Sequence, residues 1–288
     1  MAADLMKLIT QLRDKTGMGV SACKKALQDN QMDLDAAEMQ LRKQGLDKAA
    51  KKADRPTGQG VVAVRVNGLE AAMVYVSCEQ EPTTGNTRFV ELVEALLDTA
   101  LRNRVKDAEA LAGCVMASGQ TVSDALRALI GVVGENVVLR KAVALEAPAG
   151  GLIGHYLHFN KKAGALMSLK LTGADAGDAK LRTAANDVCM HAVAARPLAA
   201  RRDEIAKDVV DREVEVFREA VKDKPAAIQD KIVEGKLASF YKEKVLLEQD
   251  MVTDPEGKLT VRGVLTDAAK AAGGTMEVVA FERFELGA

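Results

Sequence analysis

The sequence predicts an α+β protein, and three observations carry this prediction. The first 50 residues have apolar residues at helical spacing, two later stretches repeat one order of strands and helices, and a segment with two narrow apolar stripes interrupts the second stretch. We therefore expect an N-terminal three-helix domain, a core of two subdomains with antiparallel sheets, and an inserted antiparallel helical hairpin. The 288 residues are 48% hydrophobic and 28% charged, which is typical of packed domains.

Three short helices and a linker are predicted over residues 1–55. Apolar residues of the first helix recur at i, i+3, i+4 and i+7 and line one face: Leu5, Leu8, Ile9 and Leu12. The loop 16–19 holds two glycines, which permit a tight reversal of the chain. Ser21 is expected to cap the second helix, and Asp33 to start a third helix that ends at Gly45. Helices this short bury little surface, so we expect a small bundle that docks on another surface, which the sequence does not identify.

A hinge and a domain boundary are predicted between Lys48 and Gly60, where positive charge is followed by Pro and Gly. The first core subdomain then spans residues 56–146. Valines alternate with other residues over 62–66, and Asn67-Gly68 supplies the favoured two-residue turn of a β-hairpin. Two helical stretches follow, the second over residues 122–133, and the strand NVVLRKAVALE completes the order strand, strand, helix, helix, strand.

The same order begins again in the second core subdomain, predicted over residues 147–205 and 245–288. A strand through HYLHF, a turn, a strand ALMSLKL and a helix that Pro197 stops are followed, after an interruption, by the last strand MEVVAFERFEL. The interruption, residues 206–244, carries a narrow apolar stripe on each side of Pro225 and charged residues on its other faces. This pattern predicts a projecting hairpin of two antiparallel helices.

Composition and charge exclude several classes of function. Forty basic and 41 acidic residues leave a net charge of -1, which gives no general attraction for the phosphates of nucleic acids. Six Phe and three Tyr offer little surface on which bases could stack. The four cysteines form no CxxC pair, the N-terminus lacks the apolar stretch of a signal peptide, and no apolar run reaches the roughly 18 residues of a membrane helix. We therefore expect a cytoplasmic protein without a nucleic-acid or membrane partner.

The side chains that usually carry catalysis do not assemble into a reactive site. His155 and His158 are three apart on a predicted strand, so they point to opposite faces and have no third ligand at metal-binding spacing. The loop 16–19 lacks the GxxxxGK[ST] pattern of phosphate-binding loops, and no serine lies in a GxSxG sequence. His191 is open to two interpretations, a satisfied buried histidine or an exposed contact. A protein that works by binding, without a cofactor or a metal, is the resulting prediction.

Five segments spread over the chain resemble the bacterial elongation factor Ts family. They are LRDKTGMGVSACKKAL at 12–27, AAKKADR at 49–55, GENVVLRKAVALE at 134–146, MHAVAARP at 190–197 and IVEGKLASFYKEKVLLEQ at 232–249. The resemblance implies that the three-helix domain is ubiquitin-associated-like, and it implies the same two-subdomain core and inserted hairpin. Because the sequence ends just after FERFELGA, the additional C-terminal module of some members is expected to be absent.

The resemblance implies a guanine nucleotide exchange factor for the GTPase elongation factor Tu. Such a protein binds the GTPase in its GDP-bound or nucleotide-free state. Binding weakens the contacts of the GTPase with Mg²⁺ and the phosphates, so that GDP is released. A partner that prefers the nucleotide-free conformation lowers the affinity of the GTPase for the nucleotide. The nucleotide lowers the affinity of the GTPase for the partner by the same factor. No catalytic side chain is needed, which agrees with the lack of a reactive site.

The resemblance also implies roles for individual residues. Arg13 and Lys24 coincide with basic positions of the family's N-terminal contact surface for the GTPase. Val20 and Ser21 stand where many members carry two methionines. His191 matches a contact histidine of the family, which sets a contact role beside the buried-histidine interpretation.

The sequence departs from the family at the TDFV motif, whose phenylalanine wedges between helices of the GTPase. Gln80, Glu81, Pro82 and Thr83 occupy this Mg²⁺-dislocating segment here, so the aromatic wedge is missing. An aromatic side chain buries roughly 150 to 250 Å², whereas Pro82 supplies a smaller and stiffer apolar tip. Glu81 keeps the negative charge of the family's Asp. We expect exchange to persist with a recessed wedge and to depend more on the N-terminal helices, the core and the hairpin.

Two other functions remain as alternatives. The altered segment also suits a family member that holds the GTPase as a chaperone or assembly partner without promoting exchange. The rate at which a fluorescent GDP leaves the GTPase distinguishes these two functions. An α+β enzyme acting on a small molecule would need a nucleophile, a base and an orienting group in one place, and the sequence offers no such set.

Overall fold

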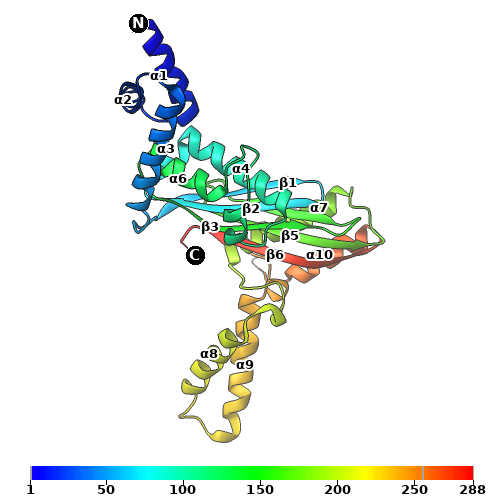
Figure 1. The fold of residues 1–288 in the computed structure, drawn as a ribbon. Helices are drawn as coiled ribbons and strands as arrows, with labels where there is room; N and C mark the ends of the chain where they lie inside the picture. Colours follow the sequence, from blue (N-terminus) through cyan, green and yellow to red (C-terminus); the bar gives the residue numbers. More distant parts are fainter. Residues whose placement is uncertain (1, 255, 288) are drawn as a thin grey trace. The chain divides into compact units, whose positions relative to one another are not determined.

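The computed structural model describes residues 2–254 and 256–287 and shows an α+β protein (Figure 1). The described residues form ten α-helices and two three-stranded antiparallel sheets. Met1 and Ala288, the outer limits of the predicted domains, lie outside the described residues. The chain divides into two compact units, which we describe separately, and the five-part division stays a prediction. The first unit is Met1–Arg65, Ala72–Ala144 and Phe284–Ala288, and the second is Val66–Ala71 and Leu145–Arg283.

Three helices of the first unit form the N-terminal bundle. They are α1 (Ala2–Thr16), α2 (Val20–Asp29) and α3 (Leu34–Ala50). The apolar faces predicted from helical spacing are confirmed, because Leu12, Cys23 and Leu27 are buried together with Ala37 and Leu41 of α3. Their burial provides the hydrophobic stabilisation that holds the three helices to one another.

The caps of the bundle helices are predicted correctly in one case and wrongly in another. Asp33 caps α3, since its carboxylate accepts hydrogen bonds from the N–H groups of Asp35 and Ala36. The prediction that Ser21 caps α2 is wrong. Gly19 is the N-cap, without a side-chain hydrogen bond, and Ser21 is already the second residue of the helix.

Helix α3 continues past Gly45, where the sequence predicts its end, and stops at Ala50. Gly45 faces Gly131 of α6 (Val122–Val133), and a Cβ added to Gly131 would lie 2.7 Å from the Cα of Gly45. These glycines allow two helices to approach closely, rather than allowing the chain to turn. The ammonium of Lys52 adds a hydrogen bond to the carbonyl of Gly134. The bundle therefore docks on α6 within the first unit.

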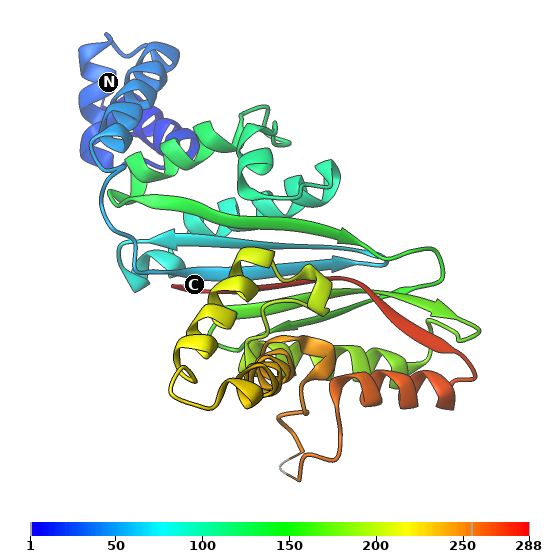
Figure 2. The same cartoon turned by 90° about the horizontal axis from the view of Figure 1, so that it is seen from below.

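The sheet of the first core stretch has the strand order β1-β2-β3 (Figure 2). Its strands are β1 (Gln59–Asn67), β2 (Glu70–Cys78) and β3 (Val137–Glu146). The predicted hairpin is present, but its turn lies one residue later than predicted: Asn67 is the last residue of β1, and the two turn residues are Gly68 and Leu69. Gly68 has the positive φ of +61° that a turn with glycine in its first position requires. Helix α4 (Thr87–Asn103) buries Phe89 and Leu96, and α6 buries Leu129, in the same core cluster as strand residues such as Val76. A short helix, α5 (Ala108–Gly113), is an addition to the predicted order.

The second unit repeats this arrangement around the strand order β4-β5-β6. The strands are β4 (Leu152–Leu157), β5 (Ala163–Thr172) and β6 (Thr275–Glu285), with β4 and β5 paired from Leu152 opposite Leu169 to Leu157 opposite Gly164. Helix α7 (Ala179–Ala195) ends at left-handed Arg196, just before Pro197, as predicted. Helix α10 (Val261–Ala271) was not predicted, although Val261, Leu265 and Ala269 recur at i, i+4 and i+8 and are buried.

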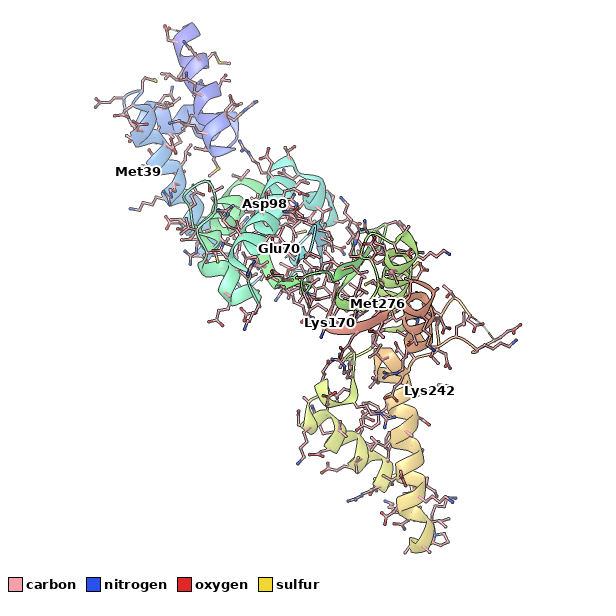
Figure 3. The ribbon with its side chains drawn as sticks, turned by 90° about the vertical axis from the view of Figure 1, so that its right-hand side faces the viewer. Met39, Glu70, Asp98, Lys170, Lys242 and Met276 are labelled. Carbon is pink, nitrogen blue, oxygen red and sulfur yellow. The ribbon has the colours of Figure 1, made fainter. Side chains whose placement is uncertain are left out.

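The predicted helical hairpin consists of α8 (Lys207–Glu219) and α9 (Ala226–Lys244). Pro225 separates them and is the N-cap residue of α9. Only a narrow seam is covered, because α8 buries no residue fully and Phe240 of α9 packs against a small cluster that includes Phe217. Lys242, labelled in Figure 3, pairs with Asp250 at 2.8 Å at the base of the hairpin. None of the described helices is long and apolar enough to cross a membrane.

Candidate partner-binding surfaces

The predicted contact residues of the N-terminal bundle are exposed on α1 and α2. Val20 and Lys24 are one helical turn apart and share one face of α2, with Ser21 beside them. All three are exposed, as is Arg13 on α1. Val20 is 47% exposed, which is a large fraction for a β-branched apolar side chain. The bundle thus offers one apolar and three polar or basic side chains to a partner.

Arg13 lies close enough to α2 for its charge to act on the thiol of Cys23. Burial raises the pKa of Cys23, while a hydrogen bond with Thr16 and the positive charge of Arg13 oppose this shift. Neither the Arg13 nor the Lys24 side chain has an ion pair or a hydrogen bond among the described residues. Both cations are therefore available to the carboxylates and carbonyl oxygens of a partner.

The predicted Mg²⁺-dislocating segment forms a short, anchored turn. Glu81 begins a 3₁₀ helix, η1 (Glu81–Gly85), in which Pro82 is the second residue and its fixed φ restricts the backbone. Gln80, Glu81 and Pro82 are exposed, whereas Thr83 is buried. The N–H of Gln80 donates to the carboxylate of Glu135 at 3.1 Å. The exposed tip is therefore a carboxylate beside a proline ring, in a conformation that its neighbours hold.

Asn136 also anchors the segment 80–83, through a hydrogen bond to the preceding residue Glu79, and the sequence did not predict this role. Its backbone N–H donates to the carboxylate of Glu79 at 2.6 Å. Its side-chain amide donates to the carbonyls of Ala53 and Arg55 at 3.1 and 2.8 Å. Because Asn136 is only 2% exposed, these hydrogen bonds are shielded from water and hold the linker, the segment and the start of β3 together. The polar pair Glu135-Asn136 directly before an apolar strand was the available signal.

Arg88 connects this segment to the bundle within the first unit. Asn86 caps α4 immediately after η1, and Arg88 follows in the first turn of that helix. Its guanidinium donates to the backbone carbonyl of Asp14 at 2.7 Å, next to Arg13 on α1. The exposed residues of α1 and α2 and the anchored turn after β2 therefore belong to one compact unit.

His191 is buried in the second unit, not exposed for direct contact. The N–H of Val252 donates to its Nδ1 at 3.1 Å, so in the neutral ring the proton is on Nε2, which donates to the Gln249 side-chain carbonyl at 2.9 Å. The Gln249 amide continues the network to the carbonyl of Glu243 at 2.6 Å. The ring thus joins α7 to the segment that follows α9, and both of its nitrogens are satisfied.

Buried cysteines serve as packing residues. The Cys78 thiol donates to the carbonyl of Gln80 at 3.2 Å, and burial raises the pKa of Cys78 to about 11. Burial also raises the pKa of Cys189. Both thiols are therefore protonated near neutral pH and are weak nucleophiles. In the described part of the chain, no three His, Cys, Asp or Glu residues gather where they could hold a metal ion.

Comparisons with known proteins decide the family. The family model described as Elongation factor TS matches residues 83–288. A relative from Beijerinckia indica is 37% identical over 286 residues, covering 97% of this chain and 91% of its own. Relatives from Chlamydia trachomatis and Xanthobacter autotrophicus are 35% and 38% identical, covering 98% and 100% of this chain and 98% and 93% of their own. All three are named Elongation factor Ts.

The chain belongs to the elongation factor Ts family.

The elongation factor Ts resemblance inferred from the five motifs is thereby confirmed over nearly the whole chain. The matched range of the family model begins at Thr83, so Gln80, Glu81 and Pro82 fall just before it. This is the place where the sequence departs from the TDFV motif. The family membership makes this protein an elongation factor of protein biosynthesis.

The sequence analysis of this elongation factor Ts chain missed one exposed aromatic residue, Phe159. It is 86% exposed at the turn between β4 and β5, and its ring lies 4.5 Å from that of His158, centroid to centroid. The Tyr156 hydroxyl lies 3.0 Å from Nδ1 of His158 and makes a hydrogen bond with it. A phenylalanine directly before the polar turn residues Asn160 and Lys161 was the available signal, because such positions are normally polar.

The buried position of His191 predicts a pH effect on stability. Burial lowers the pKa of His191, and the hydrogen bond to Gln249 opposes the shift. Below the unfolded value near 6.5, the unfolded chain takes up a proton that the folded chain resists, so the free energy of unfolding falls as the pH falls. In urea titrations between pH 7.5 and 5.5, His191→Gln is expected to show a shallower fall than the parent protein. Equal slopes in the two proteins would contradict this assignment.

Proposed function

We propose that this protein is a guanine nucleotide exchange factor that binds elongation factor Tu and promotes the release of GDP during translation elongation. The observation that carries the proposal is the joint presence, on one unit, of an anchored acidic turn and of two exposed cations that have no partner among the described residues. Arg13 and Lys24 are the cations, and Glu81 lies in the turn. We further propose that the three-helix bundle is ubiquitin-associated-like. The role places the protein in the cytoplasm without direct nucleic-acid contact.

Exchange of this kind needs binding energy and no bond-making side chain. The factor binds the nucleotide-free GTPase more tightly than the GDP-bound form, so its binding weakens the hold on GDP by the same factor. The exposed carboxylate of Glu81 and the ring of Pro82 would act near the Mg²⁺ and phosphate site. Anchoring by Glu135 and Asn136 supports this role, because a turn that is already ordered loses little conformational entropy on binding.

His191 enters this proposal as a positioning residue, since its ring is buried. The imidazole of His191 accepts a hydrogen bond from the backbone N–H of Val252, and Val252 is 51% exposed. We propose that the imidazole orders this segment so that Val252 contacts the GTPase. Phe159 is a second exposed apolar group of the same unit and a further candidate contact.

The test is the release of a fluorescent GDP from elongation factor Tu in a stopped-flow instrument, with and without this protein. We expect the release rate to rise with the concentration of the factor and to saturate. An unchanged rate at a saturating concentration would overturn the exchange function.

The presence of Pro82 at the position of the family's wedge phenylalanine favours one second candidate, a partner that binds the GTPase without promoting exchange. Sizing of the mixed proteins by chromatography with light scattering detects the complex independently of nucleotide release. A stable complex together with an unchanged release rate would support this binding or chaperone role.

A Pro82→Phe substitution is expected to accelerate GDP release by about tenfold at saturating factor, because an aromatic ring buries more apolar surface on the partner. The measurement is the same stopped-flow trace. Pro56→Phe is the matched control, since Pro56 is exposed in the linker of the same unit and should leave the rate unchanged. A Pro82→Phe rate equal to that of the parent protein would show that this position does not act as the wedge.

A further inference from the structure

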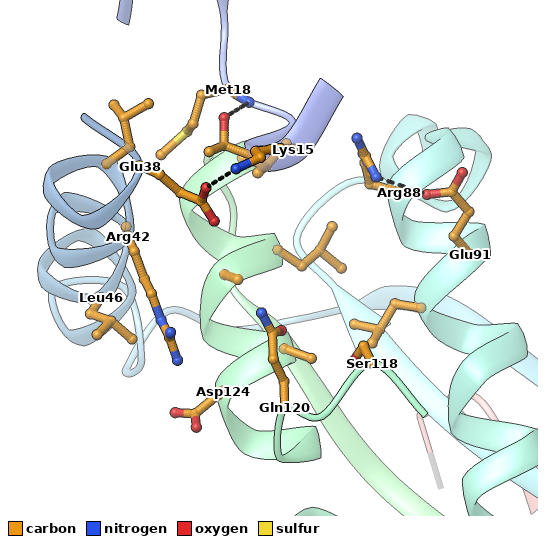
Figure 4. A pocket seen from close by; sticks show the side chains of 18 of the residues that line it. Lys15, Met18, Glu38, Arg42, Leu46, Arg88, Glu91, Ser118, Gln120 and Asp124 are labelled. Carbon is orange, nitrogen blue, oxygen red and sulfur yellow. Dashed lines mark hydrogen bonds and ion pairs between the residues drawn. The ribbon is translucent and has the colours of Figure 1, made fainter. Parts of the chain in front are cut away.

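A pocket of about 380 Å³ lies in the first unit between the N-terminal bundle and helices α4 and α6 (Figure 4). This volume is within the roughly 300 to 1,000 Å³ of small-molecule sites. Its lining includes apolar residues from the bundle and from the core helices. They are Met18, Leu41, Leu92, Met116, Leu129 and Val132. The pocket is distinct from the exposed residues proposed above for contact with the GTPase.

The pocket follows from the way in which α3 and α6 meet. The backbones of the two helices approach closely at Gly45 and Gly131, and Gly45 is part of the pocket lining. Beyond that point the side of α4 that carries Leu92 and Ala95 forms the opposite wall. Small residues along the α6 side, Ala125 and Ala128, leave the space between these walls unfilled.

The charged groups of the lining are paired, with one exception. The pairs are Lys15 with Glu38, Arg88 with Glu91, and Asp124 with Arg127 outside the lining, at N–O distances of 3.0, 3.4 and 3.4 Å. Arg42 has no ion pair or hydrogen bond within the part of the chain that the structure describes. The guanidinium is therefore the cation that remains available to a ligand in the pocket.

Figure 4 shows where this cation points. The Arg42 side chain extends along α3 toward the side of the pocket where Gln120 and Asp124 lie. Ser118 and Gln120 are part of the lining, and they add a hydroxyl and an amide that can donate hydrogen bonds. Leu46, 36% exposed, adds apolar surface to the lining. The lining is thus apolar along its walls, and its polar groups include neutral donors and a guanidinium that no other described residue pairs with.

We propose that this pocket binds a small amphipathic anion, with its carboxylate on Arg42 and its aliphatic chain between α3, α4 and α6. A guanidinium presents a fork of N–H donors that matches a carboxylate. The apolar walls take up the chain, since removing it from water is favourable. Because the walls come from the bundle and from the core helices of one unit, an occupied pocket fastens the bundle to α4 and α6.

The experiment titrates decanoate, below its micelle concentration, into the full chain labelled with ¹³C at the methionine methyl groups. Met18 and Met116 line the pocket, and Met167 and Met251 are buried in the second unit and serve as internal references. We expect saturable shifts of the Met18 and Met116 methyl signals and none of Met167 or Met251. Shortening the probe to octanoate should weaken binding by about fourfold for each CH₂ removed.

Two variants separate the head group from the chain. Arg42→Gln should weaken decanoate binding about tenfold, because it removes a charged hydrogen-bond partner. Lys43→Gln is its matched control, since Lys43 is the next exposed cation of α3 and does not line the pocket. Ala128→Leu fills the space and should abolish the shifts at Met18 and Met116.

Three results would overturn the proposal. Absence of shifts at Met18 and Met116 would show that the pocket is not a ligand site. Equal affinity for decanol or decylammonium, or for Arg42→Gln and the parent protein, would show an apolar cavity without preference for an anion, such as one that receives a partner's side chain. Equal shifts at Met167 and Met251 would show unspecific partitioning of the probe. None of these readouts depends on nucleotide exchange.

Discussion

A Gly131→Ala substitution is expected to lower the free energy of unfolding of the first unit by about 1 to 3 kcal/mol, because it overfills a contact that has no spare room. The added Cβ would lie 2.7 Å from the Cα of Gly45, so α3 and α6 must move apart. The bundle should then open more readily from α6. Urea denaturation measures the loss of stability, and faster proteolysis of the linker after Ala50 reports the opening.

Gly235→Ala is the matched control for this prediction. Gly235 lies within the exposed helix α9, and a Cβ there would meet no atom within 4 Å. Because alanine favours the helix over glycine, this variant should gain up to about 1 kcal/mol. If Gly131→Ala also gained stability, the two glycines would not define the docking contact. The opposite signs expected for one chemical change make the comparison sensitive to packing alone.

A double charge reversal, Arg13→Glu with Lys24→Glu, is expected to raise the concentration of factor needed for half-maximal GDP release by roughly 10 to 100-fold. Both side chains are exposed and have no intramolecular partner among the described residues, so the substitutions remove no contact that stabilises the fold. The loss should appear as weaker binding to the GTPase. A concentration series of the stopped-flow experiment measures it, and the thermal midpoint should stay unchanged.

Lys7→Glu with Lys25→Glu is the control for the effect of net charge. Lys7 and Lys25 are exposed on α1 and α2, and reversing them changes the net charge by the same amount. An equal loss of affinity in both double variants would mean that the overall field of the bundle matters, and not the proposed contacts. Binding of the parent protein should also weaken with salt more steeply than that of the Arg13 and Lys24 variant.

The two proposed contact elements differ in how they reach a conformation suited to binding. The bundle residues lie on regular helices, whose backbone is ordered by its own hydrogen bonds. The turn around Glu81 and Pro82 depends on Glu135 and on Asn136, which are distant in sequence. Preorganisation of this turn reduces the entropy lost on binding, and it offers a physical reason why exchange can persist when the wedge is a proline ring.

Much of the fold follows from local pattern. Alternation of valines before Asn67-Gly68 predicts the first hairpin, and the structure has this hairpin with its turn one residue later, at Gly68 and Leu69. The apolar period over 122–133 predicts α6 with the observed bounds. Such elements are set by residues that are neighbours in sequence, so a single sequence is sufficient to identify them.

The errors arise where distant residues compete with a local signal. Gly45 is a plausible helix end by composition, yet it lies inside α3 because it meets Gly131, more than 80 residues away. Ser21 is a good N-cap residue, but the helix begins at Val20 after the Gly19 cap. The burial of His191 likewise depends on Gln249 and Val252, which only the folded chain brings to the ring.

The sequence by itself determined the α+β class, the first β-hairpin, the interrupting helical pair and the family, because each rests on short-range spacing or on motifs. Tertiary structure alone decided that Arg13 and Lys24 have no partner among the residues that the structure describes, that Asn136 holds the turn at Glu81, and that a pocket with Arg42 in its lining lies beside the glycine contact. The physical reason is that exposure, pairing and cavity volume depend on which side chains meet after long-range packing. No local period in the sequence encodes these long-range contacts between side chains.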